Sequence, residues 1–330
     1  MSEADPSLPP PAVSVVVPNW NGRRWLPGCL RSLSHQTLSP LEVIVVDNGS
    51  TDGSASYLAS DHPEVRVLAL AANSGFAHAA NLGLRAAEAE LIALINTDVV
   101  LEPDWLARMA SAVRSAAGVA AVACKMVELA APARIYDAGD VLRRDGACEQ
   151  RGRFTLDDGR FDDPGEVFGA CAGAALYRRA PVLAVGGFDE RYFAYLEDVD
   201  LALRLRLAGW SCRYEPAVAL HAGEGSSTAL AGGHRFLVAR NTLLLLAKFW
   251  PVRWLGLVAY RQLGWAWHAA RERRLRAHAR ALAAAVPLLR GALRARHTVH
   301  RSAVVPIEAA IPPRPWRGPA AEGHPARHAR

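Results

Sequence analysis

The chain of 330 residues has almost no lysine, few cysteines and no long uninterrupted apolar run. Its two lysines are Lys125 and Lys248, so arginine supplies the other 36 of its 38 basic residues. The five cysteines are odd in number and never spaced as CxxC, which argues against a disulfide framework or a zinc site and favours buried free thiols in a reducing compartment. No stretch reaches the roughly 18 apolar residues that a membrane-spanning helix needs.

Several sequence signals of other protein classes are also missing. The N-terminal residues, MSEADPSLPPPAV, lack the basic start and apolar run of a signal peptide, so we expect a flexible leader at residues 1–11 and a cytoplasmic protein. Neither a P-loop nor GxGxxG follows the first expected strand, which excludes those two modes of nucleotide binding. The absence of a GxSxG elbow argues against a serine hydrolase.

Charge is distributed unevenly along the chain. Residues 231–330 hold 18 basic and three acidic residues, whereas residues 1–230 hold 20 basic and 29 acidic ones. Such a division indicates an anionic partner for the C-terminal part, either a membrane or a nucleic acid. Because this part is also rich in Trp and Leu, we expect a basic, amphipathic, membrane-associating helical region at 236–300. Trp250, Trp254, Trp265 and Trp267 are expected at the level of the lipid headgroups. A disordered basic tail is expected at 301–330.

Short β-branched runs alternate with segments of helical spacing in the first hundred residues. Strands are expected at 12–18, 41–46, 65–70 and 91–95, with helices at 24–34 and about 77–89 between them. This order predicts the α/β class, with a mostly parallel sheet flanked by helices in one domain over residues 12–235. The polar, Gly- and Asp-rich stretch 125–168 is expected to form a peripheral loop or hairpin region.

Polar residues follow three of the expected strands, where a parallel sheet of this class binds its ligands. They are Asn19-Trp20-Asn21, Asp47-Asn48 and Asn96-Thr97-Asp98. Ordinary turn chemistry is the alternative for each cluster taken alone. Asp98 is either a metal ligand at the sheet edge or the cap of a helix that opens near Glu102.

Two further candidates lie in the second half of the chain. Glu197 and Asp198 open a segment of helical spacing, where they are either a catalytic acidic pair or simply an acidic first turn. His221 ends the strand-like run AVALH and is either a ligand for a metal or phosphate or an ordinary packed histidine.

Five motifs in this order resemble the inverting family 2 glycosyltransferases with the GT-A fold, and most of all their rhamnosyltransferase-like branch. The resemblance covers about residues 12–225, and it rests on VSVVVPNWNG, LEVIVVDNGSTDGS, NSGFAHAANLGL, LIALINTDVV and GGFDERYFAYLEDVDLALRLRLAGW. It implies transfer of a sugar from a nucleotide diphosphate to a hydroxyl group, with inversion of the anomeric configuration and with help from Mg²⁺ or Mn²⁺.

The resemblance also implies roles for individual residues. Asp198 would be the base, with Glu197 the other member of the acidic pair, and Asp98 and His221 would bind the metal. Asn96 stands where the family's DxD motif has its first aspartate, which leaves Asp98 as the one carboxylate of the motif. The residues implied in binding the nucleotide sugar are Pro18, Asn19, Trp20, Asp47, Asn73, Gly75, Phe76, Asn81, Asn96, Thr97 and Gly173.

The sequence thus predicts a glycosyltransferase of cell-envelope polysaccharide synthesis that sits on the inner face of the cytoplasmic membrane. By resemblance, the expected donor is dTDP-rhamnose and the expected acceptor is a glycan or a lipid-linked glycan. The alternatives are a nucleotidyltransferase, which would be expected to carry a Gly-rich basic loop near the first strand, and a nucleic-acid-binding protein that uses the basic tail. A processive synthase would instead show spanning helices and a QxxRW-like motif, and neither is present.

Overall fold

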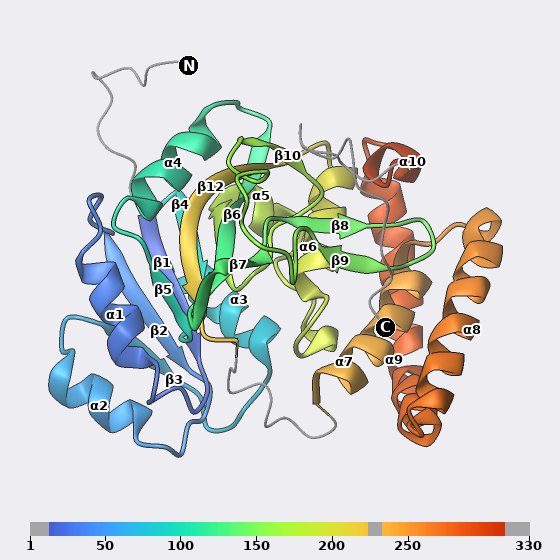
Figure 1. The fold of residues 1–330 in the computed structure, drawn as a ribbon, viewed down its shortest axis with the longest axis horizontal. Coiled ribbons are helices and arrows are strands. Elements are labelled where there is room, and N and C mark those ends of the chain that lie inside the picture. Colours follow the sequence, from blue (N-terminus) through green and yellow to red (C-terminus); the bar gives the residue numbers. More distant parts are fainter. Residues whose placement is uncertain (1–12, 224–232, 314–330) are drawn as a thin grey trace.

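A computed structural model describes residues 13–223 and 233–313 of the chain. A ten-stranded sheet runs through its centre in the order β10-β12-β6-β11-β4-β1-β2-β3, with β5 and β7 paired to β12 and β6 outside this path. Helices cover both faces of the sheet, and a group of C-terminal helices stands at one end (Figure 1).

The N-terminal half of the sheet is the parallel part that the sequence predicts. Strand β1 lies between β2 and β4, and β3 extends the sheet beyond β2, all in parallel register. All but one of the residues of β1 are buried, and all of those of β4 are, as expected for strands covered on both faces. The elements are β1 (Val13–Asn19), α1 (Leu26–Ser34), β2 (Glu42–Asp47), α2 (Ser54–Asp61), β3 (Arg66–Ala69), α3 (Phe76–Ala86) and β4 (Leu91–Ile95).

The second half of the sheet is mixed. Strand β11 lies antiparallel to both β4 and β6, while β6 and β12 run parallel to each other. The elements here are β5 (Val99–Leu101), α4 (Trp105–Arg114), β6 (Val119–Glu128), β7 (Ala131–Asp137), β10 (Gly165–Val167), β11 (Ala174–Arg178), α5 (Arg179–Ala184), η1 (Glu190–Tyr192), α6 (Glu197–Leu207) and β12 (Ser211–His221). The sheet therefore departs from the parallel arrangement at β11, within the mostly parallel sheet that the sequence predicts.

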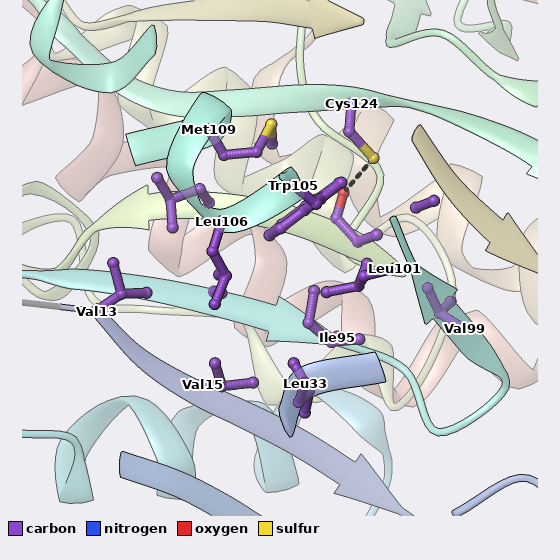
Figure 2. Close-up of a cluster of buried hydrophobic side chains, with 14 of the residues drawn as sticks. Val13, Val15, Leu33, Ile95, Val99, Leu101, Trp105, Leu106, Met109 and Cys124 are labelled. Atoms are coloured by element: carbon purple, nitrogen blue, oxygen red, sulfur yellow. Dashed lines mark hydrogen bonds between the residues drawn. The ribbon is translucent and has the colours of Figure 1, made fainter. Parts of the chain in front are cut away.

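The core on one face of the sheet is built around α4. The indole of Trp105 is fully buried among strand side chains such as Ile95 and Leu101 (Figure 2). The Cys124 thiol donates to the Ala174 carbonyl 3.3 Å away, across the neighbouring strands β6 and β11. All five cysteines are unpaired, and burial raises the pKa of the Cys124 thiol to about 12. The expectation of free thiols is confirmed.

The stretch 125–168 is more structured than expected. It begins inside the central sheet, because β6 extends to Glu128 and β7 pairs back on it. The hairpin of β8 (Asp140–Leu142) and β9 (Cys148–Gln150) forms a separate two-stranded sheet. Lys125 is buried and paired with Asp157 at 3.0 Å and with Asp162, which ties the following loop to β6.

The C-terminal helices pack on the first part of the chain. They are α7 (Gly233–Phe249), η3 (Val252–Trp254), α8 (Leu255–Arg271), α9 (Leu275–Ser302) and α10 (Ile307–Ala310). Trp250 and Trp254 are 2% and 5% exposed and belong to the hydrophobic cluster that joins α7 to α6. The prediction that these two tryptophans face a membrane is therefore wrong, since they fill the core between helices.

Two other expectations need correction. The helical spacing of the segment predicts that Arg204 and Arg206 lie away from the apolar face of α6. In the structure both are buried, with Arg204 bonded to Asp200 and Arg206 to the carbonyls of residues 167 and 168. The prediction of disorder at 301–330 is wrong for the first part of this range, because Ile307 of helix α10 is buried. Residues 314–330, like the expected leader at 1–11, lie outside the described residues.

Candidate active site

The first polar cluster lies where β1 and β2 end. The Asn19 amide donates to Asp47 Oδ1 at 2.9 Å and to Ser50 Oγ at 3.1 Å, and the Ser50 hydroxyl donates to the same Asp47 oxygen. Asn19 and Asp47 are buried and come from adjacent parallel strands. The cluster therefore fixes one carboxylate oxygen of Asp47 and orients the side chain at the sheet edge. Pro18, inside β1, and Trp20, directly after it, are half-buried beside this cluster.

A second amide cluster fixes the loop that enters α3. Asn48 donates to Asn73 Oδ1 and to the Gly75 carbonyl, both at 3.1 Å, and accepts from the Ser74 amide at 2.8 Å. Phe76 then opens α3 with its ring edge-on to that of Phe188. Asn73 and Gly75 thus lie in one bonded loop that leads into α3 at Phe76.

The third cluster joins the ends of β4 and β12. His221 Nε2 lies 3.5 Å from Asp98 Oδ2, and both side chains are 8% exposed. The Gly223 amide donates to His221 Nδ1 at 2.8 Å, which orients the ring so that Nε2 faces the carboxylate. Asp98 is not a helix cap, since β5 follows it directly and the N-cap of α4 is Asp104. Burial lowers the pKa of His221, the charge of Asp98 opposes this fall, and nearby Arg153 adds to it. The net lowering favours the neutral imidazole, which is the form that binds a metal.

Two glycines mark close approaches around Asn96 and Thr97. A Cβ atom at Gly22 would lie 2.2 Å from Asn19 Oδ1 and 2.9 Å from Thr97 Oγ1, so the ends of β1 and β4 meet at this residue. A Cβ atom at Gly173 would lie 3.6 Å from Asn96 Nδ2. Thr97 is buried and Asn96 half-exposed, which leaves Asn96 open to a ligand.

The acidic pair occupies the first turn of α6, as predicted. Asp198 accepts hydrogen bonds from the Ala172 amide at 3.2 Å and from the Val199 amide at 2.8 Å. Glu197 is buried, and its Oε2 atom has no hydrogen-bond partner among the described residues. Burial raises the pKa of Glu197 well above its usual value, and Asp198 raises it further. Burial also raises the pKa of Asp198, but the two backbone donors oppose that rise, so Asp198 is the member that more readily carries the negative charge.

Two buried aspartates near this pair were not predicted. Asp137 ends β7 and Asp140 opens β8, at 1% and 4% exposure. Burial raises the pKa of Asp137 to about 7, against the Gly139 amide that donates to it, and the charge of Asp198 adds to the rise. Burial, followed by the charges of Asp137, Asp198 and Glu197, raises the pKa of Asp140 well above its usual value. Asp198 thus lies near two buried carboxyl groups whose pKa values are raised.

An aromatic residue and an arginine complete the surroundings of His221. The Tyr136 ring stacks on the imidazole with centroids 4.0 Å apart and planes at 19°, and the Arg153 guanidinium lies 4.3 Å from the centre of the Tyr136 ring. The sequence analysis missed both residues. Both lie in the stretch with weak periodicity. The pairing of β7 with β6 brings Tyr136 to the site, and backbone hydrogen bonds between Ile135 and residues 154 and 155 bring Arg153 beside it.

Asn81, another predicted ligand-binding residue, is buried and hydrogen-bonded within the protein. Its amide donates to the Phe188 carbonyl at 2.8 Å and to Glu190 Oε1 at 2.9 Å, and accepts from the Phe188 amide at 2.8 Å. The side chain therefore links α3 to the loop that precedes α6.

Comparison with known proteins agrees with this arrangement. A family model described as glycosyl transferase family 2 matches residues 14–186. An N-acetylglucosaminyl-diphospho-decaprenol L-rhamnosyltransferase of Mycobacterium tuberculosis is 31% identical over 255 residues, which cover 68% of this chain and 82% of the relative. A putative glycosyltransferase EpsH of Bacillus subtilis is 36% identical over 102 residues, or 30% of this chain and 29% of the relative.

Solved structures share the fold at lower identity. The mannosyltransferase PcManGT of Pyrobaculum calidifontis, in complex with GDP-Man and Mn²⁺, superposes with a TM-score of 0.53 at 22% identity over 90% of this chain and 87% of its own. GalNAc-T7 with UDP, GalNAc and Mn²⁺ superposes with a TM-score of 0.60 at 14% identity over 75% of this chain and 49% of its own. The architecture is thus the expected GT-A fold, and the chain belongs to glycosyl transferase family 2.

Proposed function

We propose that this chain is an inverting glycosyltransferase that moves rhamnose from dTDP-rhamnose to a hydroxyl group of a lipid-linked glycan. One relationship carries the proposal: the acidic pair and the Asn96–Asp98 motif are anchored to consecutive residues. Ala172 donates its amide to Asp198, and the carbonyl of the next residue, Gly173, accepts from the Asn96 amide at 2.8 Å. A base and an anion-neutralising motif so placed can act on two sides of one anomeric carbon. The name of the mycobacterial relative supports the choice of sugar and acceptor.

The proposed base acts through a simple proton transfer. The acceptor hydroxyl gives its proton to the Asp198 carboxylate and attacks the anomeric carbon, while the bond to the diphosphate breaks on the opposite face. The Ala172 and Val199 amides hold the carboxylate in place throughout. The pKa of Glu197 is raised well above its usual value, which favours the protonated form, so Glu197 would not accept the proton. A single displacement of this kind inverts the anomeric configuration.

Asp98 and His221 fit a divalent cation that the substrate helps to bind. A buried carboxylate and a neutral imidazole face each other at 3.5 Å, and both are ligands that Mg²⁺ or Mn²⁺ accepts. No group of three or more His, Cys, Asp or Glu side chains suited to a metal occurs among the described residues, so diphosphate oxygens and water would complete the coordination. When bound, the cation would neutralise charge on the leaving diphosphate.

The nucleoside and the diphosphate have their own candidate contacts. Asp47, whose Oδ1 atom is held by Asn19 and Ser50, would accept a hydrogen bond from the base through its other oxygen. Asn73, Gly75 and Phe76 would shape the loop beside the sugar. Arg153, which lies over the Tyr136 ring beside His221, would add a positive charge near the diphosphate.

Peripheral membrane contact through α8 is also part of the proposal. None of the described helices is both long and apolar enough to cross a membrane. Helix α8 lies at the outer end of the molecule, beyond α7 and α9 (Figure 1), and its exposed side chains include Tyr260 at 82%, Leu263 at 70% and Trp267 at 61%. Exposed arginines follow at 271, 273, 274 and 276. Amphipathic rings next to basic residues suit an anionic lipid surface, where a lipid-linked acceptor would be found.

The proposal is tested with a panel of nucleotide sugars. We expect dTDP-rhamnose with Mn²⁺ to raise the melting temperature more than GDP-mannose, UDP-galactose or UDP-N-acetylglucosamine, since a ligand of the native state stabilises it. Transfer to an N-acetylglucosaminyl diphospholipid is then followed by chromatography, and NMR gives the anomeric configuration of the product. Preference for another donor would reject the rhamnosyl assignment, and retained configuration would reject the single displacement.

A further inference from the structure

The loop directly before the acidic pair has an unusual backbone. Phe193, Tyr195 and Leu196 have φ angles of 65°, 70° and 66°, a left-handed region that side chains other than glycine seldom adopt. Leu196 is the N-cap of α6, so the next residues are Glu197 and Asp198. Such a conformation persists only where surrounding contacts hold it, and it is typical of functional sites. The position of Asp198 depends on the contacts that keep this loop in place.

Those contacts come mainly from one side chain on α7. Asn241 is completely buried, and its Nδ2 atom donates to the carbonyls of Tyr192 at 3.0 Å, Ala194 at 2.8 Å and Tyr195 at 2.6 Å. Arg240 Nε donates to Asn241 Oδ1 at 2.8 Å, which keeps the amide nitrogen turned toward the loop. Three carbonyls of loop 192–196 thus share the two hydrogens of one amide group.

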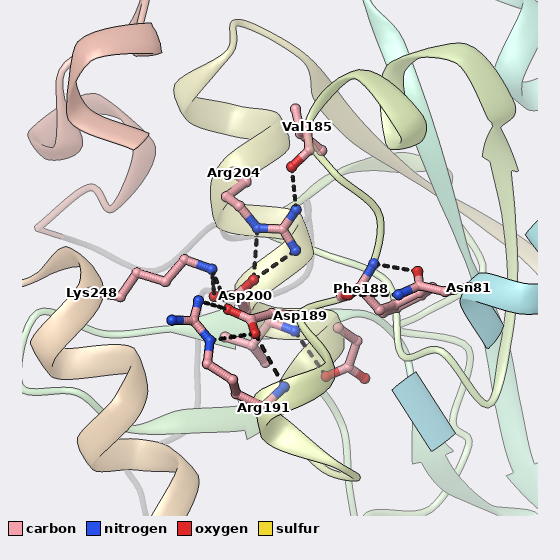
Figure 3. A network of polar contacts seen from close by, with 10 residues as sticks. Asn81, Val185, Phe188, Asp189, Arg191, Asp200, Arg204 and Lys248 are labelled. Carbon is pink, nitrogen blue, oxygen red and sulfur yellow. Dashed lines mark hydrogen bonds and ion pairs between the residues drawn. The ribbon is translucent and has the colours of Figure 1, made fainter. Parts of the chain in front are cut away.

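Two further contacts clamp the same segment. On α7, Lys248 binds Asp200 at 2.6 Å and Asp189 at 2.8 Å, within the network of charges that includes Arg191 and Arg204 (Figure 3). On the other side, the Phe193 carbonyl accepts from the Ala77 amide at 3.1 Å. A Cβ atom at Gly75 would lie 2.7 Å from that carbonyl oxygen, so the loop is pressed closely against the start of α3.

We propose that Asn241 is a positioning residue for glycosyl transfer, which holds loop 192–196 in the left-handed conformation that presents Asp198 to the acceptor. The inference rests on the proposed role of Asp198 as the base. It makes α7 part of the catalytic unit, although the sequence suggested that the region from 236 onward serves membrane association. Asn241 contacts the loop and not the reacting atoms. It therefore affects the rate of transfer by fixing the position of Asp198.

The test compares two substitutions of Asn241 with a control on the same helix. Asn241→Ala removes the amide, whereas Asn241→Asp keeps its size and loses its donors. Thr242→Val is the matched control, because Thr242 is equally buried but its hydroxyl bonds only to the Val238 carbonyl of its own helix. We expect both Asn241 variants to lower kcat by about tenfold to a hundredfold, since a shift near 1 Å of a catalytic group has effects of that order. The control should keep its rate.

Two readouts distinguish positioning from a general loss of stability. The dissociation constant of dTDP, measured by calorimetry, should stay within about twofold of the parent, and the acid limb of the pH profile of kcat/KM should move because the surroundings of Asp198 change. Hydrogen exchange should quicken at residues 193–198 in the variants. Arg240→Ala is the replacement variant if the Asn241 variants do not fold. Arg240 is half-buried, and its substitution removes a hydrogen bond to the Tyr192 carbonyl. It should lower kcat in the same direction by a smaller factor.

An unchanged kcat and pH profile in a folded Asn241 variant would overturn the inference. If neither Asn241 variant folds, the same result in folded Arg240→Ala would overturn it. So would a variant in which dTDP affinity falls as much as kcat, because the defect would then be in donor binding. Asp198→Asn separates this failure from that of the proposed function. If Asp198→Asn remains active, the base is misassigned, whereas an inactive Asp198→Asn beside a fully active Asn241→Ala rejects only the role of Asn241.

Discussion

The Tyr136 ring covers one face of the His221 imidazole, with the ring centroids 4.0 Å apart. Burial raises the pKa of Tyr136 to about 12, so the phenol stays neutral and adds no negative charge to the site. Arg153 lies over the same tyrosine ring, 4.3 Å from its centre. The stack thus sets a fixed positive charge next to the Asp98–His221 pair, where a leaving diphosphate would gather negative charge.

Arg153→Ala should therefore weaken binding of dTDP by about tenfold, the loss expected for one charge-assisted contact. Isothermal calorimetry measures this directly and does not depend on turnover. Arg160→Ala is the control, because Arg160 lies on the same loop and pairs with Asp158 at the surface. Equal affinity of the two variants would place Arg153 outside the donor site.

Asp98 should determine both the response to metal and the affinity for donor. Asp98→Asn keeps the shape of the side chain but removes the charge that faces His221 at 3.5 Å. We expect Mn²⁺ to stop raising the affinity for dTDP in calorimetry, and turnover to fall below one per cent of the parent, which is about 3 kcal/mol of transition-state stabilisation. Normal turnover of this variant in the presence of EDTA would contradict the metal role.

The two acids of the pair should differ in their effect on the chemical step. Asp198→Asn should slow turnover by about 10²-fold or more, whereas Glu197→Gln should act less, because Glu197 is held protonated. Since burial raises the pKa of Asp198, its proton-accepting form is lost as the pH falls through that raised value. The rate should accordingly decline on the acid side at a higher pH than for an exposed aspartate. The reverse order of the two variants would transfer the role of base to Glu197.

Much of the fold and part of the site could be predicted from local sequence. The apolar runs of four strands and the polar residues that follow three of them are local patterns, and the structure puts β1, β2, β3 and β4 within one or two residues of the expected ranges. The pairing of Asp98 with His221 was suggested only by resemblance, because the two residues lie far apart in sequence.

The parts that were missed depend on tertiary packing. Asp137 and Tyr136 reach the site because β7 folds back on β6, and nothing in the periodicity of the stretch 125–168 predicts that pairing. Trp250 and Trp254 were misassigned for a related reason. Apolar and aromatic side chains that fill a core between helices have the same sequence pattern as those that meet a lipid surface, and only their burial separates the two uses.

Asp137 gives a stability prediction with a defined sign. Burial raises its pKa to about 7 from 3.8, so the folded protein retains a proton that the unfolded chain loses. The free energy of unfolding should therefore decrease as the pH rises from about 4 to about 7. Asp137→Asn removes this effect, and its melting temperature should exceed that of the parent by about 3 °C or more at pH 8. At pH 4, calorimetry should find the two close together. An equal difference at both pH values would mean that Asp137 does not titrate in this range.

Helix α8 should bind anionic membranes through its exposed apolar side chains. Leu263→Ser and Trp267→Ser together would remove two large apolar groups that are 70% and 61% exposed, without touching the buried Trp250 and Trp254. In flotation at low salt, the parent should float with vesicles containing anionic lipid and less with neutral ones, because arginines each gain about 1 kcal/mol near an anionic surface. The double variant should remain at the bottom of the gradient while its transfer to a short soluble acceptor persists.

Leu129→Ser is the control, since Leu129 is 41% exposed in the turn between β6 and β7. If the parent ignores anionic vesicles, α8 does not serve as a membrane surface. Equal flotation of parent and double variant would leave the arginines as the source of binding and reject the apolar contact.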